Sequence, residues 1–300
     1  MDTRLNPPPY SPSRSLGCLI LLICIGITTE KSRADLLEKR NIDYARFGEH
    51  AVQLDWFRPD NHQIYPGILL IHGGGWVGGS RKGFEPLAKD LAAKGYVVAN
   101  IDYRLATEAK FPGAVLDCKA AVRWMRANAK SLGLNPNQIA GVGGSAGGHL
   151  TAMVASSSGD PFFKDEVNHP RVSDALQAAI IMGAGVDQVA RVKQSRSGSI
   201  KSCVIFFGGE LNEVPDLYAK GSPITHISAA TPPILMIDGE LDHPGDRYPD
   251  FRKKLDTFGV KNEFLMIPGA KHGQWASEPF RKQYVAAMTR FLQSIFHTAR

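Results

Sequence analysis

One stretch of the chain places a serine in the setting that nucleophilic chemistry requires. Residues 139–150 begin as a short apolar run, break into glycines around Ser145, and continue as a helix-like run. The pattern G-x-S-x-G at residues 143–147 predicts a tight turn between a buried strand and a helix. Such a turn exposes the hydroxyl and leaves the amide of Ala146 at a helix N-terminus, where an oxyanion can bind. The motif predicts a nucleophilic serine; the alternative is a glycine-rich turn with an incidental serine.

A second glycine-rich loop lies upstream, at His72-Gly73-Gly74-Gly75-Trp76. It follows a continuous apolar run, residues 68–71, which is typical of a strand buried on both faces. Three consecutive glycines let the backbone turn with its amides unshielded, and we expect an amide of this loop to complete the oxyanion hole. We interpret His72 as a hydrogen bonder that fixes the loop.

A serine hydroxyl needs a base to take its proton, and the base needs an acid to hold its tautomer. His272 follows the last predicted strand, and three acids, Glu240, Asp242 and Asp246, follow the strand before it. We favour Asp242, because the loop needs some reach beyond the strand end, and interpret Asp246 as a helix cap. The order Ser145, Asp242, His272, each at the carboxyl end of a predicted parallel strand, predicts a catalytic triad.

The elements that must position these residues alternate between strand and helix. This alternation predicts an α/β fold with a mostly parallel central sheet and helices on both faces, in one catalytic domain over residues 35–300. We expect an antiparallel edge hairpin at 41–59, further strands at 68–71, 96–101, 139–144, 175–182, 232–237 and 263–267, and helices at 84–94, 111–133, 149–154, 248–258 and 279–296. The less regular stretch 183–231 is predicted to hold a small lid or substrate loop, with ordinary connecting helices as the alternative.

The remaining histidines and cysteines suggest no further chemistry. No strand-end position is predicted for His149, His169, His226 or His243, which we interpret as ordinary loop or surface residues. No cluster of histidine, cysteine and carboxylate residues has metal-ligand spacing, so we expect no metal and no cofactor. The formal net charge of +6 is not gathered in a basic stripe, which argues against a nucleic-acid partner.

The N-terminus has the pattern of a secretory leader. Arg4 and Arg14 precede an apolar core, residues 16–27, which is too short to span a bilayer as a conventional helix. The small-x-small sequence at residues 32–34 offers a cleavage site. We therefore predict that residues 1–34 are a signal peptide and that the protein is secreted or periplasmic. An uncleaved signal anchor that tethers it to the membrane is the alternative.

Three motifs together carry a resemblance to a known family: His72-Gly73-Gly74-Gly75-Trp76, Asp102-Tyr103-Arg104-Leu105 and Gly143-Gly144-Ser145-Ala146-Gly147-Gly148. From about residue 44 onward the chain resembles the carboxylesterases related to hormone-sensitive lipase, in particular bacterial acetyl-xylan or feruloyl esterase-like hydrolases. The resemblance implies the α/β-hydrolase fold, Asp242 as the triad acid, and the amides of Gly74, Gly75 and Ala146 as oxyanion donors.

The chain departs from the family pattern around the acid, with Asp238 where the family usually has histidine and His243-Pro244-Gly245 in place of a V-P-like pair. Too few residues follow the leader for the sizeable N-terminal cap of lipase-like relatives, so we expect an open site with little or no cap domain. Trp76 and Trp275 flank the active loops. We expect them to line the pocket and to stack on a sugar or an aromatic acyl group, with core packing as the alternative.

The resemblance implies a serine carboxylesterase that acts on short-acyl esters, such as acetyl or feruloyl groups on plant polysaccharides. An arylformamidase or peptidase of the same fold is the main alternative among enzymes. Outside that class, the alternative is a non-catalytic binding protein on a hydrolase scaffold. The sequence leaves the natural substrate and the oligomeric state open.

Overall fold

A single sheet of eight strands organises the computed structural model, which describes residues 1, 35–198, 200–242 and 247–296. The strand order is β1-β2-β4-β3-β5-β6-β7-β8; neighbours from β4 to β8 run parallel, whereas β1 and β2 form an antiparallel edge. The predicted mostly parallel sheet is therefore confirmed. The strands are β1 Leu36–Phe47, β2 His50–Pro59, β3 Tyr65–Ile71, β4 Val97–Ile101, β5 Leu134–Gly144, β6 Ala178–Met182, β7 Ile234–Gly239 and β8 Asn262–Ile267.

Helices cover both faces of this sheet, because its central strands are apolar on both sides. Along β6, Ile181 packs into one core cluster with α2, α4 and α8, and Ile180 packs into the other with α1 and α9. Side chains of a strand alternate between the two faces, so one apolar strand contributes to both layers. The helices are α1 Glu85–Ala93, α2 Gly113–Ala127, α3 Ala129–Leu132, α4 Ala146–Ser156, α5 Gln188–Lys193, α6 Lys201–Phe207, α7 Pro215–Lys220, α8 Pro249–Thr257 and α9 Arg281–Phe296.

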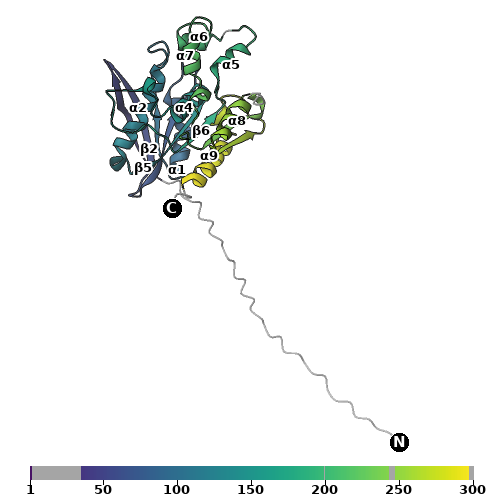
Figure 1. Cartoon of the computed structure of the whole chain (residues 1–300). Coiled ribbons are helices and arrows are strands. Elements are labelled where there is room, and N and C mark those ends of the chain that lie inside the picture. Colours follow the sequence, from purple (N-terminus) through teal and green to yellow (C-terminus); the bar gives the residue numbers. More distant parts are fainter. Residues whose placement is uncertain (2–34, 199, 243–246, 297–300) are drawn as a thin grey trace. The chain divides into compact units, whose positions relative to one another are not determined.

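Two segments differ from the sequence-based expectation or refine it. The strand predicted at 139–144 begins earlier, at Leu134, and its register with β3 jumps from Leu134 to Ile139. An Asx turn, in which the amide of Asn137 donates to the side chain of Asn135 at 3.0 Å, accommodates the extra residues. The irregular stretch 183–231 forms the short helices α5, α6 and α7, which gather beyond one end of the sheet (Figure 1).

The motif at residues 102–105 supports the glycine-rich loop that follows β3. The ring of Tyr103 stacks on His72 with centroids 4.4 Å apart, and its hydroxyl donates to the carbonyl of His72 at 3.2 Å. Arg104 donates to the buried carboxylate of Asp117 on α2 at 2.6 Å. Because both partners are buried or half-buried, the motif fixes the loop against the sheet rather than contacting a ligand.

From residue 2 onward, the predicted signal peptide lies outside the described residues, so secretion remains a prediction. In the part of the chain that the structure describes, no helix is long and apolar enough to cross a membrane.

Candidate active site

Ser145 lies at the junction of β5 and α4 in a strained backbone conformation, with φ 55° and ψ −120°. The turn is tight enough that a Cβ atom at Gly143 would stand 2.2 Å from the carbonyl oxygen of Gly147. A Cβ atom at Gly147 would stand 2.1 Å from the carbonyl oxygen of Ile71 in the neighbouring strand. Neither position can carry a side chain without moving backbone, which is the constraint that the G-x-S-x-G pattern predicts.

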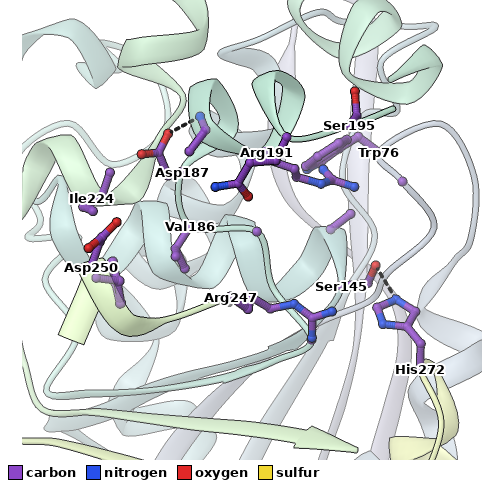
Figure 2. A pocket seen from close by; sticks show the side chains of 17 residues that line it. Trp76, Ser145, Val186, Asp187, Arg191, Ser195, Ile224, Arg247, Asp250 and His272 are labelled. Atoms are coloured by element: carbon purple, nitrogen blue, oxygen red, sulfur yellow. Dashed lines mark hydrogen bonds between the residues drawn. The ribbon is translucent and has the colours of Figure 1, made fainter. Parts of the chain in front are cut away.

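The structure brings together the three residues that the sequence places at separate strand ends. Ser145 Oγ lies 3.0 Å from His272 Nε2, and His272 Nδ1 lies 2.8 Å from Asp242 Oδ2 (Figure 2 shows the serine and the histidine). With Asp242 ionised, His272 donates from Nδ1 to the carboxylate and accepts the Ser145 hydroxyl proton at Nε2. This is the tautomer that a general base for the serine requires.

The other acids considered for this role are placed elsewhere. Glu240 accepts a hydrogen bond from the amide of Gly269 at 2.9 Å, so its carboxylate braces the loop that precedes His272. Asp246 and His243 lie outside the described residues. Of the described acids in this loop, Asp242 is the one hydrogen-bonded to the histidine.

A guanidinium group holds the same carboxylate oxygen of Asp242 that His272 contacts. Arg247 Nη1 donates to Asp242 Oδ2 at 2.9 Å and to Asp238 Oδ2 at 2.7 Å, while Nη2 donates to the Asp242 carbonyl at 3.1 Å. Asp238 is itself fixed, because it accepts from the amide of Gly183 at 2.8 Å and from the hydroxyl of Tyr248 at 3.1 Å. Sequence reasoning did not identify Arg247. The one feature of the sequence that pointed to it was the aspartate at position 238, where the family usually has histidine.

These contacts set the charge of the acid. Burial on its own would raise the pKa of Asp242, but the hydrogen bonds from Arg247 and His272 outweigh burial and hold that pKa below its ordinary value. Asp242 is therefore a carboxylate at neutral pH and can accept the Nδ1 proton of His272.

The amides predicted as oxyanion donors have no backbone acceptor among the described residues. Among the backbone hydrogen bonds of the described residues, none is donated by the amide of Gly74, Gly75 or Ala146. Gly75 and Ala146 line the same pocket as Ser145, so their amides are near the position that an oxyanion would occupy. Gly74 has φ 123°, where a Cβ atom would meet the carbonyl oxygen of Gly78 at 2.0 Å, and its role as a third donor stays a prediction.

A pocket of about 390 Å³ opens at Ser145 and His272, which is a size typical of small-molecule sites. The irregular segment after β6 supplies much of its wall, including Asp187, Ala190 and Arg191 from the start of α5. The predicted substrate segment is therefore a small helical insertion. Within the described residues, no group of histidine, cysteine and acidic side chains is placed to hold a metal ion.

The two tryptophans have different positions. Trp76 borders the pocket, but it is 2% exposed, belongs to the core cluster of α2, α4 and α8, and stacks on Phe206 with centroids 4.6 Å apart, so it also packs in the core. Trp275 does not line this pocket: it is 5% exposed, lies in the core cluster of α1 and α9, and meets the ring of His272 edge-on at 5.0 Å. The expectation that Trp275 stacks on the substrate is therefore corrected: its ring packs in the core and contacts His272.

The interpretation of His149 as a loop or surface residue is wrong. Its side chain is fully buried in α4, where Nδ1 accepts from Trp76 Nε1 at 3.2 Å and Nε2 donates to the carbonyl of Gly221 at 2.7 Å. Burial lowers the pKa of His149 to about 4, so the ring is neutral at physiological pH. The sequence signal for it was the helix-like run after Ser145, in which every position proved to be buried.

The chain is similar in sequence and in fold to known esterases. The BD-FAE family model matches residues 54–245. The chain is similar to an arylesterase of Saccharolobus solfataricus, with 40% identity over 76% of this chain and 74% of that protein. It is also similar to the esterase LipC of Mycobacterium tuberculosis, with 33% identity over 76% of this chain. The solved structure of esterase Est2 from Thermogutta terrifontis with butyrate bound has a TM-score of 0.71, with 25% identity, and covers 89% of this chain and 95% of its own.

The chain spans only about half the length of two of the mycobacterial proteins that it matches. The match spans 58% of LipC and 49% of a second mycobacterial protein, the probable carboxylic ester hydrolase LipM.

The buried, neutral His149 predicts a pH dependence of stability. Its pKa is about 4 in the folded protein and 6.5 as the ordinary value, so between these values the unfolded chain binds more protons. The contribution of His149 to the free energy of unfolding is therefore fully present above pH 6.5. It is lost as pH falls toward 4, by up to roughly 3 kcal/mol. We expect H149Q to flatten the rise of the unfolding free energy between pH 4 and 6.5, measured by urea titration.

The exposed His169 provides the control for this series. H169Q should retain the wild-type dependence, because its side chain stays in water in both states. An H149Q protein whose stability falls as steeply with acid as the wild type would contradict a neutral buried histidine.

Proposed function

Because the chain belongs to the BD-FAE family, related to hormone-sensitive lipase, we propose that it is a serine esterase that hydrolyses short-acyl carboxylic esters. The observation that supports this most strongly is the unbroken hydrogen-bonded series from Ser145 through His272 to Asp242, beside a pocket lined by the amides of Gly75 and Ala146. In this proposal these residues supply the groups that acyl transfer requires: nucleophile, base, acid and oxyanion donors.

In the proposed acylation step, His272 Nε2 takes the hydroxyl proton as Ser145 Oγ attacks the ester carbonyl. The carbonyl oxygen becomes an oxyanion, which the amides of Gly75 and Ala146 stabilise more strongly than the neutral carbonyl. Asp242 stabilises the imidazolium that forms. His272 then donates the proton to the departing alkoxide, leaving the acyl group on Ser145.

Water then hydrolyses the acyl-enzyme, with water as the nucleophile and Ser145 Oγ as the leaving group. His272 removes a proton from water, hydroxide attacks the acyl carbonyl, and the proton returns to Ser145 Oγ as the acid leaves. The side chain of His272 is 44% exposed, so water reaches the base directly. The same openness leaves room for a bulky alcohol group.

Short acyl groups on larger alcohols suit this site best. Est2, the similar esterase of known structure, has butyrate bound, and the pocket here is of modest volume. We propose acetyl or feruloyl groups on plant polysaccharides as substrates, consistent with a protein that is exported by the predicted leader at residues 1–34.

Ester assays on residues 35–300 test the proposed function. We expect hydrolysis of p-nitrophenyl esters to decline beyond short acyl chains, with activity on acetylated xylan or methyl ferulate. The hydrolytic activity of S145A should fall to near background, because no other described hydroxyl is hydrogen-bonded to His272. D242N should lower kcat on the order of 10⁴-fold, because an amide stabilises the wrong tautomer of the histidine.

Other outcomes of these assays would contradict the proposal. Folded protein that cleaves N-formylkynurenine but no ester would point to the arylformamidase alternative, and folded protein inactive on all substrates would point to a binding scaffold. A D242N variant with wild-type kcat would overturn the assignment of the acid.

Arg247 is a positioning residue in this scheme, and its removal should alter the pH profile. R247Q takes away the donor that lowers the pKa of Asp242 while burial, which raises it, persists. Asp242 would then become protonated at a higher pH, so the acidic loss of kcat/KM should begin at higher pH than in the wild type. We expect kcat at neutral pH to fall roughly 10- to 100-fold through misplacement of the triad.

Partial recovery in R247K would show that the charge matters as well as the shape. The matched control is R252Q, which removes an exposed arginine of α8 that bonds Asn262 and does not line the pocket. It should leave kcat and the pH profile unchanged. An R247Q profile that superimposes on the wild type would rule out the electrostatic role.

A further inference from the structure

Two arginines line the pocket, and they differ in how their charges are balanced. Arg247 forms ion pairs with Asp238 at 2.7 Å and with Asp242 at 2.9 Å, so two carboxylates neutralise it. Arg191, on α5, lines the same pocket from the opposite wall (Figure 2). Its surroundings are quite different.

The partners of the Arg191 guanidinium are all uncharged in the described part of the chain. Nη1 donates to the side-chain oxygen of Gln188 at 3.2 Å and to Cys203 Sγ at 3.6 Å, and the group lies over the ring of Trp76 at 5.6 Å. Arginine carries its charge at every physiological pH, and a half-buried cation without a counter-ion is unfavourable. The site is therefore electrostatically incomplete until an anion enters.

The acidic residues that line this pocket do not complete it. Asp187 caps α5, where its carboxylate accepts from the amide of Ala190 at 2.9 Å. Asp250 is exposed at the start of α8. In Figure 2 both lie near Ile224, whereas the Arg191 guanidinium points toward Trp76. The cationic side of the pocket is thus separate from its acidic side.

We propose that Arg191 binds a carboxylate carried by the substrate, so that the preferred esters have an anionic acyl or alcohol part. The planar guanidinium matches a carboxylate with two parallel hydrogen bonds, and the N–H groups other than Nη1 remain for that contact. Its position is set in advance, because Gln188 and Cys203 hold one end and the Trp76 ring supports its face. Trp76 is in turn fixed by buried His149. This inference rests on the proposed esterase function and adds the charge of the substrate.

Matched pairs of esters test it on either side of the scissile bond. For the alcohol side, 4-acetoxybenzoate is compared with its neutral methyl ester; for the acyl side, monomethyl glutarate is compared with dimethyl glutarate. The readout is the ratio of kcat/KM for the charged ester to that for the neutral one. Taking this ratio in each variant cancels differences in intrinsic reactivity and in general damage to the site.

In R191Q we expect the ratio for one pair to fall roughly 10- to 100-fold, the effect of losing a hydrogen bond to a charged group. The pair that responds identifies the side of the ester that carries the anion. The control is K193Q, which removes an exposed charge from the same helix outside this pocket. Its ratios and its activity should match the wild type, because an exposed distant charge is screened by salt.

Unchanged ratios in folded R191Q for both pairs would overturn the inference while leaving the esterase function intact, since Ser145-dependent hydrolysis of the neutral esters tests that function separately. If R191Q does not fold, the wild type decides: benzoate should inhibit more strongly than benzamide, with the advantage shrinking as NaCl is added. Equal inhibition by the two would equally overturn it.

Discussion

The close approach of backbone at Ser145 is the constraint on which the rest of the site depends. A serine at φ 55° is held between β5 and α4 because Gly143 and Gly147 let the turn pack against itself and against β3. Such a conformation costs free energy, on the order of 1–3 kcal/mol, and it persists only where packing over-determines it. The buried C-terminal halves of β3 and β5, the fully buried strand β6 and the buried helix α4 provide that packing. The hydroxyl is therefore presented to His272 by a rigid frame.

Sequence reasoning predicted those parts of the site that follow from local pattern and strand order. Ser145, Asp242 and His272 each lie just after a parallel strand, and parallel strands end at one edge of the sheet, so the residues had to meet there. The glycines of both loops were recognisable because only close backbone contact requires them. The alternation of strands and helices that places them was also recognisable, because the spacing of apolar residues carries it.

The residues that were missed depend on tertiary contacts that no local pattern records. Arg247 contacts Asp242 and Asp238 in the folded protein, which no spacing pattern in the sequence predicts, and Asp238 cannot be told from other strand-end acids until its partners are known. His149 occupies a helix that is buried all round, so its polar ring had to be satisfied by Trp76 and Gly221. Trp275 was misplaced because flanking an active loop in sequence does not decide which face of the loop a ring occupies.

Covalent labelling tests most directly whether Ser145 is the nucleophile that His272 activates. Diethyl 4-nitrophenyl phosphate reacts with an activated serine, and mass spectrometry of the intact protein and of its peptides locates the adduct. We predict one diethylphosphate group, on the peptide that carries Ser145, with loss of esterase activity in proportion to labelling. An adduct on a different residue accompanied by loss of activity, or full labelling of Ser145 without loss of activity, would contradict a nucleophilic Ser145.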